Sequence, residues 1–249
     1  MNTRRYPPVA AMSASERTAV VRDIFTTVHA RYDFLNHLLS FRRDVGWRRA
    51  AVARMRFRRT HRFLDVATGT ADLAIAAARS WPGVTVAGVD FAAPMLEVGR
   101  EKVRDAGLES RVELQEADAL ALPYSDASFD VSAIAFGMRN IPDKPRALRE
   151  MARVTVPGGQ VMVLEMTFEP APAFRPLYRL YLVRVLPALA RLFARNGAGY
   201  QYLSDSIRAF PAPAAFAAVM RDAGLKGVTW YPLTFGSAYL HVGRVPGGA

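Results

Sequence analysis

Hydrophobic and polar positions in the central part of the chain follow two alternating periods, one typical of buried strands and the other of helices. Short apolar runs predict five strands: Phe63–Val66, Val84–Val89, Val112–Glu116, Val131–Phe136 and Gln160–Glu165. Helical spacing between them predicts three helices: Asp72–Ser80, Pro94–Ala106 and Lys144–Thr155. Strands that alternate with helices in this way predict an α/β fold with an open, mostly parallel sheet.

The C-terminal part of the pattern predicts how this sheet ends. The turn Pro157-Gly158-Gly159 is expected to end the last of these helices before its strand. Farther along, a helix is expected at Phe210–Ala223, ended by Gly224. The final apolar runs, Val228–Tyr231 and Ala238–Arg244, are close enough in sequence to pair antiparallel. A seven-stranded sheet with a terminal antiparallel hairpin pair is the outline of the Rossmann-like fold of S-adenosylmethionine-dependent methyltransferases.

The chain before the first strand predicts helical structure. Residues Ser15–Leu39 carry apolar side chains at helical spacing, and a second, arginine-rich helix is expected at Trp47–Phe57. We therefore expect residues 1–62 to form an N-terminal helical lid segment. Residues 63–249 are expected to form the methyltransferase domain, with a helical insertion near residues 172–200.

The composition limits the chemistry that the chain can perform. Its 249 residues, 51% of them hydrophobic, suffice for one domain with a substantial core. The absence of cysteine excludes thiol nucleophiles, thiolate metal sites and disulfides, and no metal site is expected. The sequence has no apolar run typical of a signal peptide or a membrane span. We therefore expect a cytoplasmic protein, either soluble or peripheral on the inner face of the membrane.

The net charge of +11 is unevenly distributed along the chain. Residues 1–62 and 170–249 carry net charges of +10 and +7, whereas residues 63–169 carry a net charge of −6. Such basic flanks attract anionic surfaces, either nucleic acid or lipid. Arginines outnumber lysines 30 to 3, so codon bias is an alternative explanation for part of this charge.

The strongest local signal is the passage from the first predicted strand into the following helix. The strand ends at Asp65, and a loop with Gly69 and Thr70 follows it. Ligands of doubly wound sheets bind beyond the carboxyl ends of the strands. Gly69 permits close approach of the backbone, while Asp65 and Thr70 offer polar contacts to an amino-acid-like ligand. The next strand ends at Asp90, whose carboxylate can accept both hydroxyls of a ribose.

This loop does not match the glycine pattern of dinucleotide-binding sites. Ala71 and Ala74 stand where that pattern has its later glycines, and Asp72 occupies the start of the helix, where a phosphate would bind. S-adenosylmethionine carries no phosphate, and its sulfonium and ammonium groups favour nearby carboxylates. We therefore predict an S-adenosylmethionine site. An ordinary strand–turn–helix connection with a capping aspartate is the alternative.

The ends of the second and third predicted strands add three further candidates. In this fold the strand end at Asp118 and Ala119 flanks an adenine, and Asp118 would accept a hydrogen bond from the exocyclic amine. Phe91, directly after Asp90, is a candidate to cover a face of the purine. A place in the hydrophobic core explains Phe91 equally well.

Several motifs, most of them outside the cofactor region, are more specific. From the N-terminus onward they are Tyr32-Asp33-Phe34-Leu35-Asn36 with Ser40 and Trp47-Arg48, Asp65 to Ala74, Phe136-Gly137-Met138-Arg139-Asn140, Arg153-Val154 with Pro157-Gly158-Gly159, Leu164-Glu165, Tyr200-Gln201-Tyr202-Leu203, Ser206-Ile207 and Phe210-Pro211. With these motifs in this order, over about residues 20–245, the chain resembles the ubiquinone/menaquinone biosynthesis C-methyltransferase family.

The resemblance implies C-methylation of the ring of a polyprenylated quinol precursor. The reaction would convert demethylmenaquinol to menaquinol, or methylate 2-methoxy-6-polyprenyl-1,4-benzoquinol in ubiquinone synthesis. S-adenosylmethionine would donate the methyl group. The family's cofactor contacts carry over onto Thr70, Asp90 and the pair Asp118-Ala119.

The chain departs from the family pattern at three places. Ala71 replaces a glycine that the family usually has in the cofactor loop, and Ala135 stands where a small hydroxyl residue is common. The stretch from Phe41 to Gly46 differs from the usual glycine- and histidine-containing version. These differences bear on the width of the cofactor site, on one polar contact and on the contacts of the lid.

The chemistry of ring methylation needs a phenolate and a proton acceptor. Arg139 and Asn140, after the fourth strand, lie on the expected substrate side, and Arg139 would stabilise the phenolate directly or through a water. His29 and Tyr32 on the predicted lid are candidates for the proton acceptor. A lone histidine on a helix is more often structural. Tyr202 is a further candidate for the wall of the site, with core packing as its alternative.

The isoprenoid tail of such a substrate resides in a bilayer. The segment Leu177–Phe193 is apolar and spaced by Arg179, Arg184 and Arg191, as expected of an interfacial helix, although Pro187 should kink it. A lid packed on the domain and a dimer interface are the alternatives. The expected partners are the polyprenylated quinol and the membrane surface, with no nucleic acid. A homodimer and a quinone-synthesis complex are left open.

Three other functions fit parts of the sequence. The basic flanks suit an RNA methyltransferase, but Phe136 to Asn140 stands where amino-group methylation uses an Asn/Asp-Pro-Pro-Tyr-like tetrapeptide. Cysteine-dependent pyrimidine methylation is excluded, because the chain has no cysteine. A non-catalytic scaffold of a quinone-synthesis complex and a methyltransferase for another small-molecule acceptor would share the same fold.

Overall fold

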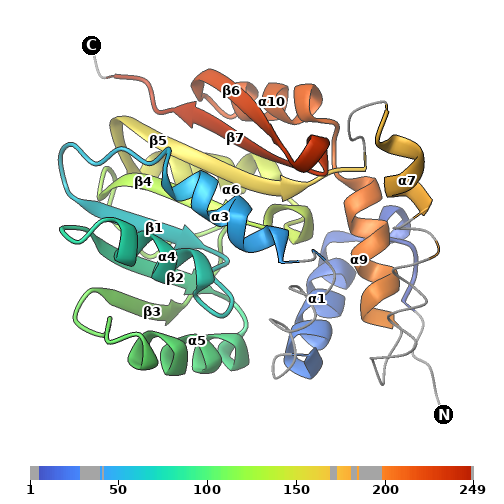
Figure 1. Cartoon of the computed structure of the whole chain (residues 1–249), viewed down its shortest axis with the longest axis horizontal. Coiled ribbons are helices and arrows are strands. Elements are labelled where there is room, and N and C mark those ends of the chain that lie inside the picture. The colour runs from blue at the N-terminus through green and yellow to red at the C-terminus, as the bar shows by residue number, and fades with distance from the viewer. Residues whose placement is uncertain are drawn as a thin grey trace.

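A computed structural model gives the structure of the chain (Figure 1). It describes residues 6–28, 40, 42–168, 173–180, 184 and 198–247. One seven-stranded sheet runs through this part of the chain, with helices on both of its faces. A group of helices from the N-terminal segment and from the segment after the fifth strand lies at one end of the sheet (Figure 1).

The sheet has the strand order β3-β2-β1-β4-β5-β7-β6. In chain order the strands are β1 (Arg62–Val66), β2 (Thr85–Asp90), β3 (Val112–Glu116), β4 (Phe129–Ala135), β5 (Thr155–Met166), β6 (Lys226–Leu233) and β7 (Ala238–Arg244). The pairs among β1 to β5 are parallel, whereas β7 lies antiparallel between β5 and β6. The predicted mostly parallel seven-stranded sheet with a terminal hairpin pair is therefore confirmed.

The helices form two layers and one terminal group. One layer consists of α3 (Arg43–Val52), α4 (Asp72–Ser80) and α5 (Ala93–Asp105), and the opposite layer of α6 (Lys144–Val154) and α10 (Pro213–Asp222). The terminal group is α1 (Ala14–Val28), α7 (Arg175–Leu180) and α9 (Ala198–Ala209). Short 3-10 helices are η1 (Val9–Ala11), η3 (Met138–Asn140) and η5 (Thr234–Gly236).

Each face of the sheet carries its own hydrophobic core. Successive side chains of a strand point to opposite faces, and Phe63 and Leu64 of β1 show this division. Phe63 belongs to the core under α3, α4 and α5, together with Trp47. Leu64 belongs to the core under α6 and α10, together with Phe216. A continuous apolar run such as Val161–Leu164 of β5, which is buried throughout, is the sequence signature of a sheet covered on both faces.

The observed bounds differ most from the predicted ones at two elements, α3 and β5. The helix predicted at Trp47–Phe57 is α3, which spans Arg43–Val52. Met55, three residues after its end, is fully buried in the core. The turn Pro157-Gly158-Gly159 lies within β5, not before it, because the register with β4 jumps from Thr155 to Gln160. A Cβ on Gly159 would lie 2.7 Å from Asp130 O, so only glycine fits this excursion of the strand.

The helical segments around the sheet were only partly predicted. Within the predicted helix Ser15–Leu39, the structure describes α1 up to Val28, and residues 29–39 lie outside the described residues. No helix was predicted at α9, and the helix predicted from Phe210 begins at Pro213. In the described part of the predicted insertion, residues Arg175–Leu180 form α7.

The topology brings one edge of the sheet together with the terminal helices. Because β1 to β5 are parallel, their carboxyl ends meet at the same edge. There, η3 follows β4 and packs against α1 and α9. Among the described ranges no helix has both the length and the apolar character needed to cross a bilayer.

Candidate active site

The loop between β1 and α4 follows a left-handed path. Ala67, Gly69 and Ala71 have φ angles of 52°, 56° and 65°, in the region that favours glycine. Thr68 N donates a hydrogen bond to Val89 O at 2.9 Å, which holds the loop on the end of β2. The backbone at Gly69 consequently lies beside the end of β2, as its predicted role requires.

Asp65 and Thr70, both predicted as ligand contacts, bind protein groups. Asp65 Oδ2 accepts hydrogen bonds from Thr68 Oγ1 at 2.7 Å and from Ala74 N at 3.1 Å, so this carboxylate stabilises the loop and the start of α4. Burial raises the pKa of Asp65 to about 7, although the Thr68 hydroxyl opposes the shift. Thr70 is buried and accepts a hydrogen bond from Lys102 Nζ at 3.2 Å.

Asp90 lies at the end of β2 and faces the same loop. Its Oδ2 accepts a hydrogen bond from Gly69 N, and its Oδ1 accepts one from Ala92 N, both at 2.9 Å. Burial raises the pKa of Asp90, and the hydrogen bonds from Ala92 and Gly69 oppose this shift. A carboxylate has about four acceptor positions, so Asp90 retains capacity for a ligand after binding these backbone groups.

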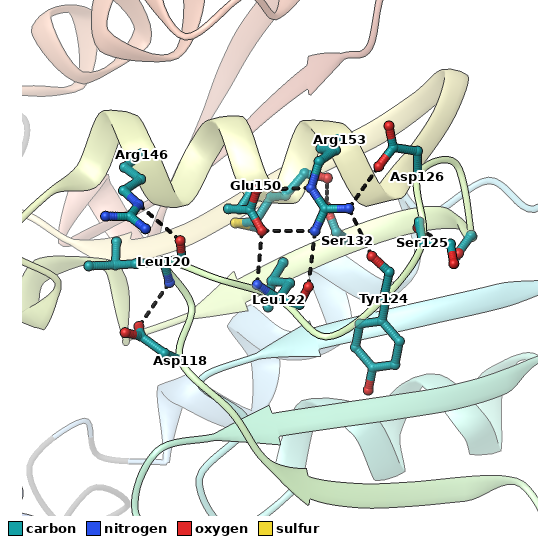
Figure 2. A network of polar contacts seen from close by, with 12 residues as sticks. Asp118, Leu120, Leu122, Tyr124, Ser125, Asp126, Ser132, Arg146, Glu150 and Arg153 are labelled. Atoms are coloured by element: carbon teal, nitrogen blue, oxygen red, sulfur yellow. Dashed lines mark hydrogen bonds and ion pairs between the residues drawn. The ribbon is translucent and has the colours of Figure 1, made fainter.

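The end of β3 supplies the next wall. Ala117 N donates to Asp90 O at 3.0 Å, which joins the ends of β2 and β3. The chain then turns at Asp118, whose Oδ1 accepts a hydrogen bond from Leu120 N at 2.9 Å (Figure 2). Asp118 and Ala119 thus lie just after the end of β3, where the sequence predicts an adenine contact.

A cavity of about 180 Å³ lies between these strand ends and α1. Of the predicted cofactor residues, Gly69, Asp90, Phe91, Asp118 and Ala119 line it. Asp65 and Thr70 are not among the described residues that line this cavity. The structure therefore brings together five of the seven predicted cofactor contacts and places the other two in the support of the loop.

Helix α1, in the predicted lid segment, supplies a wall whose residues the sequence did not identify. Thr18, Val21 and Arg22 line the cavity, and the Arg22 guanidinium lies over the Phe91 ring at 5.8 Å from its centroid. Val21 is also buried against Tyr202 of α9. The apolar stripe of this segment was visible in the sequence, but its partner was not, because contacts so distant in sequence leave no local pattern.

The loop after β4, where the sequence predicts the acceptor side, forms a further wall of the cavity. Ala135, Phe136, Gly137 and Asn140 line it, and Phe136 has a φ of 59°. Asn140 Oδ1 accepts a hydrogen bond from the Tyr202 hydroxyl at 3.3 Å. Burial raises the pKa of Tyr202, so this hydroxyl keeps its proton at neutral pH. The amide nitrogen of Asn140 is then available as a donor.

Arg139 lies beneath this loop. Its Nη1 donates to Glu165 Oε1 at 2.7 Å and to Phe136 O at 2.5 Å, and its backbone N donates to Glu165 Oε2 at 3.1 Å. Only 5% of Arg139 is exposed, and it is not among the described lining residues. Arg17 of α1 donates to Arg139 O at 2.5 Å. The ion pair with Glu165 therefore fixes the loop that carries Asn140 on β5, and the hydrogen bond from Arg17 ties this loop to α1.

The N-terminal motif is described in part. Arg48 pairs with Asp44 at 2.5 Å and with Asp72 at 3.4 Å, and its guanidinium lies over the Phe136 ring at 5.3 Å. Asp44 belongs to the stretch that departs from the family pattern, and it is buried in this pair. His29 and Tyr32, the predicted candidates for the proton acceptor, lie outside the described residues.

The chemistry of the cavity fits S-adenosylmethionine. Asp90 and Asp118 present carboxylates to the cavity, and these suit hydroxyl and amine donors. The remaining wall includes apolar side chains, among them Val89, Met95 and Ile141, which suit a purine.

The comparison with known proteins decides the family. The model of the ubiE/COQ5 methyltransferase family matches residues 11–245. The chain belongs to this family. Demethylmenaquinone methyltransferase of Thermus thermophilus is 48% identical over 223 residues, which cover 90% of this chain and all of that protein. A ubiquinone/menaquinone biosynthesis C-methyltransferase of Geotalea uraniireducens is 40% identical, over 92% of this chain and 98% of the relative.

Solved structures agree on the fold. A SAM-dependent methyltransferase from Thermotoga maritima has a TM-score of 0.62 at 19% identity, over 90% of this chain and 99% of that one. The apo structure of the S-adenosylmethionine-dependent methyltransferase SibL has a TM-score of 0.58 at 26% identity, over 80% of this chain and 54% of that longer one. The predicted Rossmann-like methyltransferase fold and the predicted methyl donor, S-adenosylmethionine, are confirmed.

Proposed function

We propose that the protein transfers a methyl group from S-adenosylmethionine to a ring carbon of a polyprenylated quinol. The acceptor is demethylmenaquinol, or the 2-methoxy-6-polyprenyl-1,4-benzoquinol of ubiquinone synthesis. The observation that carries the proposal is the full-length similarity, at 48% identity, to a protein named demethylmenaquinone methyltransferase. A rival small-molecule acceptor would have to suit the same loop after β4, which matches the motif of this family.

Binding of the donor is assigned to the carboxylates of the cavity. Asp90 would accept the ribose hydroxyls, and Asp118 with Ala119 would contact the adenine, which Phe91 covers. When bound, S-adenosylmethionine supplies an activated methyl group on a sulfonium. Asp65 and Thr70 support the loop from beneath, through Ala74 and Lys102.

Activation of the acceptor is assigned to the loop after β4. Asn140 would donate its amide hydrogen to the phenolic oxygen, because Tyr202 already donates to its Oδ1. Arg139 keeps a positive charge at all relevant pH values, and its pairing with Glu165 makes its main role the placement of Asn140. The proton acceptor stays a prediction on His29 or Tyr32.

Turnover with defined substrates tests the proposal. Purified protein is incubated with methyl-labelled S-adenosylmethionine and each reduced quinol precursor, and the products are analysed by mass spectrometry. A mass gain of one methyl group on a ring carbon is expected with at least one precursor. The Asn140→Ala variant should lose most of this turnover and retain binding of S-adenosylhomocysteine. Absence of a methylated product from every quinol in the wild-type protein contradicts the function.

We also propose that the protein meets its substrate at a membrane surface. An aromatic cluster of Phe174, Tyr178 and Phe235 lies between α7 and η5, with ring centroids 5.4 to 5.9 Å apart. Phe235 is 71% exposed, and its φ of 55° holds it in a left-handed turn. Leu180 of α7 is 48% exposed, and the chain around this cluster is basic. Exposed aromatic and basic side chains together favour a lipid interface.

The position of this cluster suits delivery of a lipid-borne substrate. β6 runs parallel to β5, so η5 follows β6 at the same edge of the sheet as the cavity. Flotation with anionic vesicles is expected to carry the wild-type protein. Phe235→Ser should weaken this binding by about 30-fold, since insertion of a phenylalanine contributes roughly 2 kcal/mol. Tyr231→Ser on β6 is the control, and equal loss in both variants, or no flotation of the wild type, refutes the proposal.

A further inference from the structure

The wall at the adenine side of the cavity is built by a long connection. Residues 117–128 join β3 to β4 without a helix or a regular strand, and their first part, Asp118 to Leu120, lines the cavity. Asp118 pairs with Ala121 only through an isolated bridge. The sheet therefore does not fix this wall, and other contacts must hold it in place.

Those contacts come from one face of α6. Arg146, Glu150 and Arg153 follow one another at spacings of four and three residues, which puts their side chains in one row on a helix. Figure 2 shows this row beside the connection, with each side chain directed at its backbone. The row therefore follows the connection from Leu120 to Asp126.

Arg153 makes most of these contacts. Its Nη1 donates to Tyr124 O and to Asp126 Oδ1, both at 2.8 Å, and its Nη2 donates to Leu122 O at 3.0 Å. Nη2 and Nε also donate to the two carboxylate oxygens of Glu150, each at 2.9 Å. A guanidinium has five N–H donors, and these five hydrogen bonds engage all of them.

Glu150 and Arg146 extend the row towards the cavity. Glu150 Oε2 also accepts a hydrogen bond from Leu122 N at 2.9 Å, so both backbone groups of Leu122 are bound by the row. Arg146 Nε donates to Leu120 O at 3.0 Å, and Leu120 N donates to Asp118 Oδ1 (Figure 2). The contact of Arg146 thus reaches the cavity wall at Leu120 and Asp118, and the contacts of Glu150 and Arg153 hold the stretch of the connection that follows it.

Helix α6 begins close to the opposite wall of the cavity. Ile141 and Pro142 line the cavity, and α6 begins at Lys144, capped by the Asp143 side chain, which accepts from Arg146 N at 2.9 Å. One rigid element is thus joined to the acceptor loop at its N-terminus and to the adenine wall along its side.

We propose that Arg153, together with Glu150 and Arg146, is a positioning residue that sets the adenine wall of the cavity relative to the acceptor loop. This inference rests on the proposed placement of the adenine beside Asp118. The guanidinium of Arg153 is partly exposed, with 32% of its side chain accessible. Exposed ion pairs add little to folding stability, whereas three directed hydrogen bonds from Arg153 to one loop restrict its conformation. Arg153 therefore acts on cofactor affinity more than on folding.

Cofactor binding and steady-state kinetics of five variants test the inference. Arg153→Gln should raise the Kd for S-adenosylhomocysteine and the KM for S-adenosylmethionine about tenfold, because several directed hydrogen bonds are lost. Arg146→Gln, which removes one bond from an exposed side chain, should raise both about threefold. Arg153→Lys should be intermediate. The kcat at saturating S-adenosylmethionine and the KM for the quinol should stay within about twofold of wild type.

The control is Arg149→Gln on the same helix, an exposed arginine without a hydrogen bond or ion pair among the described residues. It carries the same change of charge and should leave all constants at wild-type values. A merely structural role of Arg153 would lower the active fraction and the melting temperature at unchanged Kd, and that result overturns the inference. So would an equal rise of Kd in the Arg149→Gln variant.

The Asp118→Ala variant distinguishes the positioning role of Arg153 from the proposed placement of the adenine. If Asp118→Ala raises the Kd and Arg153→Gln and Arg146→Gln do not, the adenine placement stands and the positioning role is refuted. If none of these variants raises the Kd of a protein that binds S-adenosylhomocysteine, the adenine lies elsewhere and the inference falls with its placement. Binding that responds as expected, in a protein that methylates no quinol, overturns only the proposed function.

Discussion

Three non-glycine residues in the loops after β1 and β4 adopt left-handed backbone conformations: Ala67, Ala71 and Phe136. Each costs of order 1 kcal/mol relative to glycine, and such residues gather at functional sites. Ala71 is the position where the family usually has glycine, and its φ of 65° gives the physical reason for that preference. Its methyl group is fully buried, so burial of about one methyl group, worth ~0.8 kcal/mol, offsets the strain.

The carboxylate of Asp90 is the first target for substitution. Asp90→Asn should weaken binding of S-adenosylhomocysteine roughly 10- to 100-fold, since a hydrogen bond to a charged group contributes ~1.5–3 kcal/mol. Because burial raises the pKa of Asp90, wild-type affinity should also fall on acidification earlier than for an exposed aspartate. Isothermal titration calorimetry at several pH values measures both effects.

The matched control is Glu116→Gln. Glu116 pairs with Asp90 across β2 and β3 and is exposed, so it carries the same chemical change at the same register position. Its affinity should equal that of the wild type. Asp90→Asn with unchanged affinity would remove this carboxylate from the cofactor site.

At the level of the elements, the cavity depends on the close approach of two connections. The loop after β1 and the loop after β4 meet where Gly137 faces Ala67. A Cβ on Gly137 would lie 2.8 Å from Ala67 Cβ and 3.0 Å from Ile134 Cδ1. Glycine is therefore required at this position by the lack of space and not by the backbone conformation, since the φ of Gly137 is -103°.

Gly137→Ala should force these two loops apart. Overpacking of this kind costs ~1–3 kcal/mol, so the melting temperature should fall by roughly 2 to 12 °C, with weaker binding of both substrates. Gly83→Ala, at a glycine with no heavy atom within 4 Å of the added Cβ, should leave melting and binding unchanged. Circular dichroism melting curves decide, and equal behaviour of the two variants would contradict the close approach.

Across the whole molecule, two buried titratable groups have opposite effects on how stability changes with pH. Burial raises the pKa of Asp65 to about 7, so stability from this group is lost as pH rises from about 4 to 7. Burial lowers the pKa of His241 to about 4, so stability from this group is lost as pH falls from about 6.5 to 4. His241 lies near Phe216 and Trp230 and contacts Pro213 O at 3.0 Å, far from Asp65 along the chain.

Single substitutions should separate these two contributions. Asp65→Asn should make the protein more sensitive to acid than the wild type between pH 4.5 and 6.5, and His241→Gln should make it less sensitive. Each change of slope is at most about 1.4 kcal/mol per pH unit. Urea unfolding at a series of pH values measures the free energy of unfolding, and slopes identical to the wild type in either variant would refute the assignment for that residue.

The local pattern of the chain predicted most of the sheet and the strand ends that line the cavity. The predicted β3, β7 and α4 have the observed bounds, because burial on both faces produces apolar runs and because a helix that packs on a sheet has a regular apolar face. Asp90 and Asp118 could be placed at the edge of the sheet, where both line the cavity, because a polar residue at the end of a buried strand must lie at that edge. Their contacts with the cofactor stay a prediction.

Contacts between distant segments could not be predicted in this way. The same signal suggested Asp65 as a ligand contact, although its carboxylate is bound to Thr68 and Ala74 and lies outside the cavity lining. The wall from α1 and the row of polar residues on α6 were not foreseen either. Periodicity reports which face of a segment is buried, whereas the partner of that face, and the direction of each carboxylate, follow from how segments remote in sequence pack together.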